Sequence, residues 1–404
     1  MGNYLNPDIS TFARVVNSEI YVDKTGLIEY TNRSAKTLQS YICISRPRRF
    51  GKSIAANMLS AYYTCEYDSR ELFSNLKIAS SDSYEKHLNK YDVIFLNMQE
   101  FLSQSSNVEE MLSLLKKSVI WDLLDKYPDF RYFDETNLMR TLQDIYNKTK
   151  RPFVVIIDEW DCIFREYREN HEAQEQYLDF LRDFLKDKAY IHLAYMTGIL
   201  PIKKYGTHSA LNMFDEFSMT NPGPLAEFVG FTEEEVAALC KQYGRNLSEL
   251  KEWYDGYHFE KARSIYSPRS VVTAILTGIC DSYWNRTETF EALRFYIDMN
   301  FEGLKDDVLS MLAGERIPVN TGTFSNDMTT FYSEDDVLTL LIHLGYLGYD
   351  FSYKEVFIPN SEVRGEYINA VAASQWGEVS KALKNSSDTL QAIWQKYPAG
   401  RRQL

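Results

Sequence analysis

Cysteines, histidines and long apolar runs are all scarce in this chain of 404 residues. The five cysteines lie far apart and the six histidines form no metal-ligand spacing, so we expect neither a disulfide framework nor a bound transition metal. No apolar run approaches the roughly 18 residues that a membrane-spanning helix needs. The first six residues resemble no signal peptide, and Asn6 stands where N-myristoylation requires Ser or Thr. The sequence therefore predicts a soluble, cytoplasmic protein without a membrane partner.

Positive charge is also in deficit, because 44 Lys and Arg residues face 57 Asp and Glu residues, for a net charge of −13. Such a chain repels nucleic-acid phosphates on average, so DNA binding would require a local basic patch. The remaining composition is that of a globular protein, with 45% hydrophobic and 25% charged residues. At roughly 150 residues per domain, the length suggests two or three domains.

Four short apolar runs, separated by segments with helical periodicity, occupy the first half of the chain. The runs are 41–44, 93–96, 153–157 and 191–196. The third is a continuous run of Val and Ile after Phe153, which is typical of a strand covered on both faces. Strands that alternate with helices predict an α/β fold with a parallel sheet and right-handed crossovers.

The pattern changes after about residue 230, where Thr232 and Glu235 form a capping box at the start of a helix. A second short helix is expected at 250–254, with Gly256 as its stop. Farther on, helices at 308–312 and 335–344 precede two short apolar runs, which together resemble a winged helix. We expect a core at 1–232, a helical lid at 233–301, a winged-helix-like region at 302–372 and a helical tail at 373–404.

The most informative motif lies between the first strand and its helix. Gly51, Lys52 and Ser53 form the second half of a P-loop, in which backbone N–H groups at a helix N-terminus surround phosphates, Lys reaches the β- and γ-phosphates and Ser binds Mg²⁺. Arg46 replaces the first Gly of that motif, and a positive φ there would cost about 1–2 kcal/mol. The alternative is an ordinary strand-to-helix turn with solvated cations. The candidate nucleotide-binding residues are Arg46, Pro47, Arg48, Arg49, Phe50, Gly51, Lys52, Ser53 and Ile54.

Two carboxylates, Asp158 and Glu159, follow the third strand. A carboxylate at the tip of a buried strand is where such folds hold Mg²⁺, usually through water. Glu159 can accept a proton from an attacking water. The alternative is a polar strand end that enters a loop. Both half-motifs occur in the required order on the required elements, which favours a nucleotide site.

These residues carry a resemblance to a known family. The chain resembles the bacterial AAA-ATPase-like proteins that often carry a C-terminal PD-(D/E)XK nuclease-like domain, and the likeness runs from about residue 8 to 390. An arginine-rich form of the loop is itself typical of that family. The matching segments are 21–25, 46–53, 157–161, 197–200, 253–257, 265–268, 344–347 and 358–360.

The resemblance implies a role for each site residue. Lys52 and Ser53 would bind phosphate and Mg²⁺, Asp158 would hold Mg²⁺ through water, and Glu159 would be the catalytic base. Thr197 would be the polar sensor that orients water or the γ-phosphate, although a strand-end hydroxyl capping the next turn fits equally well.

The chain also departs from the family pattern. Many relatives have an Arg where this chain has Pro201, with Lys203 and Lys204 as substitutes. No Asp and Glu-x-Lys pair of the nuclease type is apparent, and the last residues differ from the family. We therefore expect a truncated linker to a missing nuclease-like domain and no nuclease activity.

These observations favour a Mg²⁺-dependent ATPase whose cycle moves the lid and the C-terminal module. The alternative is a nucleotide-gated regulatory module with little hydrolysis, because the loop is altered. A small-molecule kinase is less well supported, since no acceptor pocket has a visible signature. Self-association, a protein partner and DNA all stay open, although the acidity of the winged-helix-like region favours protein over DNA.

Overall fold

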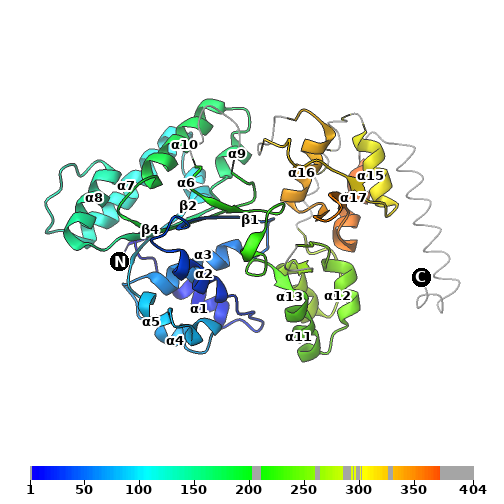
Figure 1. Ribbon diagram of the computed structural model, residues 1–404, viewed down its shortest axis with the longest axis horizontal. Coiled ribbons are helices and arrows are strands. Elements are labelled where there is room, and N and C mark those ends of the chain that lie inside the picture. Colours follow the sequence, from blue (N-terminus) through cyan, green and yellow to red (C-terminus); the bar gives the residue numbers. More distant parts are fainter. Residues whose placement is uncertain are drawn as a thin grey trace.

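A layered core lies at the centre and left of Figure 1, and two smaller groups of elements lie at its right. The computed structural model describes residues 2–202, 211–259, 264–284, 293, 295–296, 301, 303–325 and 331–373. Most of the predicted tail, from residue 374 onward, lies outside the described residues, as do Lys203 and Lys204.

The core is built on a parallel sheet of five strands in the order β2-β3-β4-β1-β5. The four strands predicted from the sequence are confirmed, and a short fifth strand joins the edge beside β1. The strands are β1 (Tyr41–Ser45), β2 (Asp92–Asn97), β3 (Phe153–Asp158), β4 (Ile191–Gly198) and β5 (Asp215–Phe217). All residues of β3 and β4 are buried, as their continuous apolar runs require.

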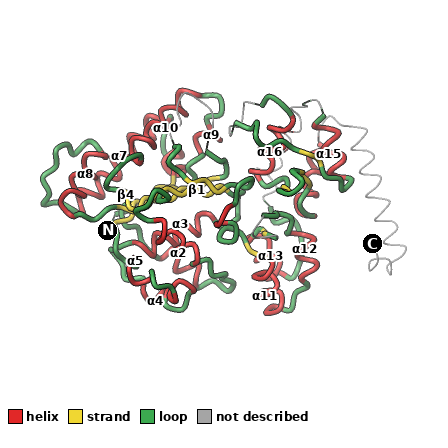
Figure 2. Tube along the Cα trace, viewed as in Figure 1, coloured by secondary structure: helices red, strands yellow, loops and turns green. Residues whose placement is uncertain are grey.

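Helices cover both faces of the sheet, with α1 to α5 on one side and α6 to α10 on the other (Figures 1 and 2). The first group is α1 (Ser10–Val16), α2 (Gly26–Ser34), α3 (Lys52–Tyr63), α4 (Arg70–Phe73) and α5 (Tyr84–His87). The second is α6 (Met98–Ser103), α7 (Val108–Lys126), α8 (Leu138–Thr149), α9 (Cys162–Glu166) and α10 (His171–Leu185). None of the helices described is both long and apolar enough to cross a bilayer.

Asparagine side chains begin many of these helices. Each accepts a hydrogen bond from a backbone N–H in the first turn, which stabilises a helix start by about 1 kcal/mol. The asparagines are Asn97, Asn107, Asn137 and Asn170.

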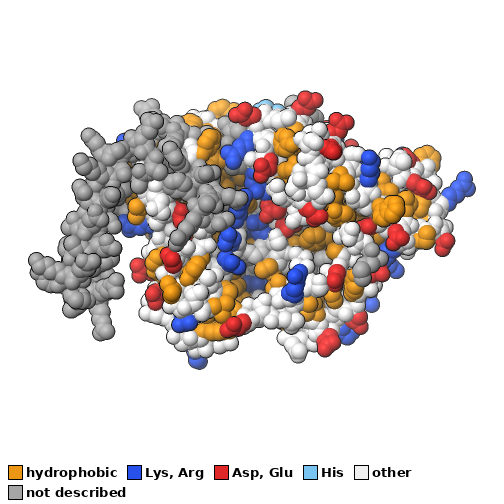
Figure 3. Space-filling view, turned by 180° about the vertical axis from the view of Figure 1, so that it is seen from behind, with side chains coloured by type: hydrophobic (Ala, Val, Ile, Leu, Met, Phe, Trp, Pro, Cys, Tyr) orange, Lys and Arg blue, Asp and Glu red, His pale blue; other side chains and the backbone are white. Residues whose placement is uncertain are grey.

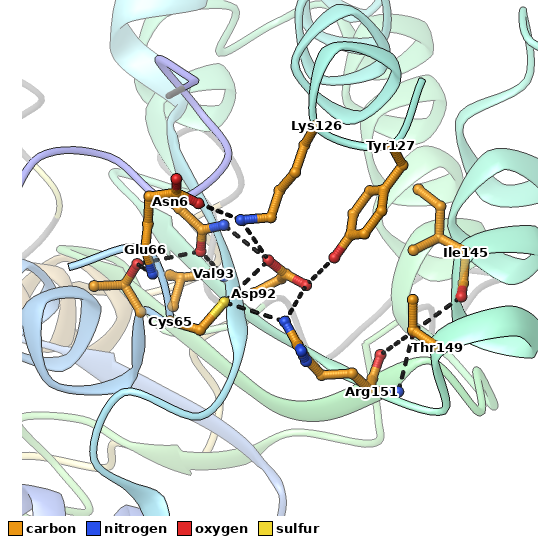
Figure 4. A network of polar contacts seen from close by, with 11 residues as sticks. Asn6, Cys65, Glu66, Asp92, Val93, Lys126, Tyr127, Ile145, Thr149 and Arg151 are labelled. Carbon is orange, nitrogen blue, oxygen red and sulfur yellow. Dashed lines mark hydrogen bonds and ion pairs between the residues drawn. The ribbon is translucent and has the colours of Figure 1, made fainter. Parts of the chain in front are cut away.

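A buried carboxylate secures the edge of the sheet where β2 begins (Figure 4). The Asp92 side chain accepts hydrogen bonds from Asn6 Nδ2 at 2.8 Å and from the Tyr127 hydroxyl at 2.5 Å. Lys126 Nζ lies 3.3 Å and Arg151 Nη1 3.7 Å from its oxygens. Burial opposes ionisation of Asp92, but these hydrogen bonds and cations hold its pKa below the ordinary value. The network joins the N-terminal arm to β2 and α7.

The lid follows the core in the chain and forms a small helical layer at the lower right of Figure 1. It contains α11 (Glu233–Tyr243), α12 (Leu247–Tyr254), β7 (Ile265–Tyr266) and α13 (Pro268–Thr277). The last strand of the core, β6 (Phe231–Thr232), pairs with β7. The predicted capping box is confirmed at the start of α11. These helices pack around an apolar cluster of their own.

Gly256 follows the end of α12, as predicted, and two structural features require a glycine at this position. Its φ is +113°, which side-chain-bearing residues rarely adopt. A Cβ built on it would also lie 2.1 Å from the carbonyl oxygen of Pro359. The close approach joins the lid to the strand-bearing segment that follows it.

The last described elements form a winged-helix-like arrangement at the upper right of Figure 1. The antiparallel sheet has the order β8-β10-β9, and the sequence analysis missed β8. The elements are α15 (Leu304–Leu312), β8 (Ile317–Pro318), α16 (Glu334–Leu344), β9 (Gly348–Asp350), β10 (Glu355–Phe357) and the closing helix α17 (Ser361–Ala373).

Candidate nucleotide-binding site

A cavity of about 1210 Å³ opens at the ends of β2 and β3, between the core and the lid. The segment 48–55 forms one wall, and parts of 12–24 form another. Glu159 lines it at the end of β3, residues just before β6 line it from the end of the core, and α13 lines it from the lid. The cavity therefore joins parts of the chain that are far apart in sequence.

The walls of this cavity are rich in cations although the chain as a whole is acidic. Figure 3 shows a band of basic side chains between the core and the C-terminal half, on the face seen from behind. The basic residues that line the cavity are Lys24, Arg48, Arg49, Lys52, Arg165 and Arg269. A local positive field of this kind is what an acidic protein needs to attract a polyphosphate.

The loop after β1 wraps into α3 through two left-handed residues. Gly51 has φ +95° and is the N-cap of α3, which begins at Lys52. Arg49 has φ +70°, which costs a side-chain-bearing residue about 1–2 kcal/mol. The positive φ considered for Arg46 is not found, so replacing the first Gly carries no backbone penalty at that position.

Arg46, one of the candidate nucleotide-binding residues, does not line the cavity. The guanidinium is fully buried, and Nη1 donates hydrogen bonds to the carbonyl oxygens of Ser45 and Phe217 at 2.9 and 3.0 Å. It also lies 4.9 Å from the ring centre of Phe259. Pro47 likewise does not line the cavity, whereas every predicted residue from Arg48 to Ile54 does.

Lys52 is the most buried of the cavity's cations, with 5% of its surface exposed. Its Nζ donates a hydrogen bond to the carbonyl oxygen of Pro47 at 3.1 Å and so closes the loop. Burial lowers the pKa of Lys52, while the charges of Glu159, Asp161 and Asp158 oppose that change. An anion that replaced the Pro47 carbonyl would gain a nearly desolvated ammonium group.

The two carboxylates predicted at the end of β3 point to different places. Asp158 is buried, and its Oδ1 accepts hydrogen bonds from Thr197 Oγ1 at 2.9 Å and from the backbone N–H of Glu159 at 3.1 Å. Glu159 lines the cavity and has φ +55°, a left-handed conformation that is costly for a glutamate. Strained residues of this kind cluster at functional sites. The structure thus brings Thr197 and Asp158 together and turns Glu159 toward the cavity.

Sequence reasoning missed Arg165, which stands on α9 beside Glu159. Its Nη2 lies 2.5 Å from Glu159 Oε2, and its Nε lies 3.3 Å from Asp161 Oδ2. The same Asp161 oxygen accepts the backbone N–H groups of Ile199 and Leu200 at 3.1 and 2.9 Å. Burial raises the pKa of Glu159, and the charges of Lys52 and Arg165 oppose that rise.

Arg269 was missed as well, and it reaches the same cavity from the lid. It is exposed and follows Pro268, the first residue of α13. Two sequence signals could have found these arginines, since Arg165 lies four residues after Asp161, at helical spacing, and Arg269 directly follows a helix-starting proline.

Apolar side chains line the cavity together with the basic ones. They include Tyr21 and Val22 from the N-terminal segment, Phe231 from β6 and Val272 from α13. Ile54, on α3, is 46% exposed although it is apolar. A cavity lined by both cationic and apolar side chains suits a ligand that carries charged and aromatic groups.

A parallel sheet with a Gly-Lys-Ser loop after one strand and a carboxylate pair after another defines a P-loop nucleoside-triphosphatase fold. Residues 8–207 match the family described as "Predicted AAA-ATPase", and the chain belongs to that AAA-ATPase-like family through this region. At a general level, the family and the fold place the chain among ATP-binding proteins.

One curated relative is an uncharacterized protein from the vnfD 5' region of Azotobacter chroococcum mcd 1. It is 22% identical over 291 residues, which are 70% of this chain and 53% of the relative. The chain therefore spans about half the length of that protein.

Two solved structures from Aeropyrum pernix are distantly similar. The ORC2 protein, in ADPNP–ADP complexes, aligns with a TM-score of 0.38 and 15% identity over 89% of this chain and 98% of its own. The ORC1 protein in complex with DNA aligns with a TM-score of 0.30 and 12% identity over 92% and 97%. Likeness at this level says nothing about what this chain binds.

Proposed function

We propose that the chain binds ATP with Mg²⁺ in the cavity between core and lid and hydrolyses the γ-phosphate bond. The observation that carries this proposal is that the Lys52–Ser53 end of the loop and Glu159 line one cavity although they come from different strands. The family membership of residues 8–207 supports the same conclusion.

Lys52 and the start of α3 would bind the phosphates. Lys52 Nζ would exchange the Pro47 carbonyl for a phosphate oxygen, because an ammonium group binds a charged acceptor more strongly than a neutral one. The first N–H groups of α3 have no partner within the helix and carry the positive end of its dipole, which also favours a phosphate.

Two oxygen donors suit a magnesium ion. Ser53 lines the cavity beside Lys52, and Asp158 ends β3, where the hydrogen bond from Thr197 orients its carboxylate, although Asp158 itself does not line the cavity. Mg²⁺ prefers one or two protein oxygens together with water and substrate phosphate. When bound, Mg²⁺ neutralises phosphate charge and polarises the bond that breaks.

Glu159 is the candidate base. Its carboxylate reaches the cavity, where it would hold a water molecule in line with the γ-phosphate and accept its proton. Thr197 would act indirectly, because its hydroxyl holds Asp158 in place through the 2.9 Å hydrogen bond. Arg269 and the loop arginines Arg48 and Arg49 would add positive charge around the phosphates.

The lid gives the nucleotide a way to act on the rest of the chain. Arg269 and Val272 line the cavity from the lid, so a bound nucleotide would contact core and lid together. A ligand that contacts both favours the arrangement in which both contacts form. We propose that a core at 1–232, a lid at 233–301 and a C-terminal module at 302–372 move relative to one another. A protein partner or a second copy of the chain would respond to that movement.

One observation favours the alternative of a nucleotide-gated module that hydrolyses slowly. The Glu159 carboxylate is paired with Arg165, and a carboxylate in an ion pair is a weaker base. ATP would then act mainly by holding the lid on the core.

Calorimetric titration with ATP and Mg²⁺ tests the proposal. Lys52→Ala is expected to weaken ATP binding at least about a hundredfold, since it removes the buried ammonium group. Lys117→Ala, on the exposed side of α7, is the matched control and should bind like the wild type. Equal ATP affinity in Lys52→Ala and Lys117→Ala would refute the proposed site.

A further inference from the structure

Two cations at the phosphate end of the cavity are bound to groups of the protein itself. Lys52 donates to the Pro47 carbonyl, and Arg165 pairs with the Glu159 carboxylate. The Arg165 side chain is only 9% exposed, and Arg165 is among the residues that line the cavity. A guanidinium that is nearly buried and yet lines a ligand cavity can exchange its partner for a ligand.

The support behind Arg165 is rigid. The helix α9 is anchored by the buried side chains of Cys162, Ile163 and Phe164. Asp161, at the N-cap of α9, is fully buried and is held by two backbone N–H groups after β4. Its Oδ2 lies 3.3 Å from Arg165 Nε, so the inner end of the guanidinium has a fixed neighbour.

The outer end of the guanidinium is the part that can change partner. Arg165 Nη2 contacts Glu159 Oε2 at 2.5 Å, and the Glu159 side chain is 23% exposed. A guanidinium matches carboxylate and phosphate oxygens with the same planar arrangement of donors. A phosphate that enters the cavity therefore competes directly with Glu159 for Arg165.

We propose that Arg165 is a γ-phosphate ligand that leaves the Glu159 carboxylate when ATP binds. The Nε end would stay on Asp161 while the Nη groups turn from Glu159 to the phosphate. Glu159 would then be free to hold the attacking water only when a γ-phosphate is present. With ADP the ion pair persists, so the base is blocked after each turnover. This inference rests on the proposed ATP site.

The exchange predicts that Arg165 distinguishes a triphosphate from a diphosphate. Arg165→Met keeps the length of the side chain and removes its charge. It should raise the Kd of the non-hydrolysable analogue ADPNP at least about tenfold, which corresponds to about 1.4 kcal/mol, and leave the Kd of ADP within about twofold. Arg165→Lys should recover part of the lost ADPNP affinity. Arg140→Met, an exposed arginine on α8, is the matched control.

Glu159→Gln should increase the affinity for ADPNP, whereas an ion pair with a purely structural role predicts no such increase. The glutamine retains the shape of the side chain and removes the charge that competes for Arg165. It should bind ADPNP more tightly than the wild type and ADP equally well. It also keeps the experiment decisive if Arg165→Met fails to fold.

The outcomes separate the two proposals. Equal losses of ADPNP and ADP affinity in Arg165→Met, or unchanged ADPNP affinity in both Arg165→Met and Glu159→Gln, would overturn the role of Arg165 and leave the ATP site intact. Failure of the wild-type chain to bind either nucleotide would refute the ATP site and Arg165 with it.

Discussion

Replacing the buried carboxyl group of Glu362 should make the folded chain more stable at neutral pH. Glu362 lies on α17, and its Oε1 accepts the backbone N–H groups of Tyr283 and Trp284 at 2.7 and 2.9 Å. Ser270, on the lid helix α13, donates to the same carboxyl group. Burial raises the pKa of Glu362 from 4.5 to about 7, although these hydrogen bonds oppose the rise.

The raised pKa of Glu362 determines how the stability of the folded chain depends on pH. The folded state holds its proton more tightly than the unfolded state, so the free energy of unfolding falls as pH rises from about 4.5 to about 7 and is level above that. One pKa unit corresponds to about 1.4 kcal/mol, so the stability lost above pH 7 is about 3–4 kcal/mol. Glu362→Gln keeps an oxygen acceptor for both backbone N–H groups and removes the charge.

Urea unfolding at several pH values between 5 and 8 measures the difference. Glu362→Gln should gain stability over the wild type steadily as pH rises toward 7, and the gain should then remain constant. Glu315→Gln, at an exposed position, is the control and should follow the wild-type curve. A parallel pH dependence in Glu362→Gln and the wild type would show that Glu362 ionises without cost, and would refute the reasoning.

Two further predictions concern stability at opposite ends of the molecule. Gly256→Ala would place a methyl group against the Pro359 carbonyl oxygen at a φ of +113°, so it should lower the free energy of unfolding by about 3 kcal/mol. In the control Gly244→Ala a Cβ meets no atom within 4 Å, so only the positive φ should cost stability, by about 1–2 kcal/mol. Equal losses in the two variants would contradict this prediction. Asp92→Asn should lower the free energy of unfolding by about 2–4 kcal/mol in urea at pH 7, because it removes the buried charge that Lys126, Arg151 and the Tyr127 hydroxyl all contact. An unchanged midpoint would show that the network adds nothing to stability.

Elements that depend on their own residues could be predicted from the sequence, whereas elements that depend on distant residues could not. The strand β3 could be recognised because its short, continuous apolar run is typical of a strand that is buried on both faces of a sheet. In contrast, β5 and β8 have only three and two residues and are partly exposed, so they exist mainly because a neighbouring strand offers hydrogen bonds.

The same reasoning applies to the site. Gly51, Lys52 and Ser53 form a local motif, so their approach to the cavity could be predicted from spacing alone. The position of Arg46 could not, because it depends on the Phe217 carbonyl, in the unpredicted strand β5, and on the Phe259 ring. The hydrogen bonds of Asp161 could not be predicted either, because they depend on β3 and β4 lying side by side in the sheet. Asp161 follows β3 and accepts the N–H groups of residues after β4.

The rate of Mg²⁺-dependent ATP hydrolysis in Glu159→Gln tests the central claim most directly. Because the glutamine cannot accept a proton from water, the variant should bind ATP and yet turn it over at least about a hundredfold more slowly than the wild type. Turnover at the wild-type rate by a Glu159→Gln variant with intact ATP binding would contradict the assignment of the base at the end of β3.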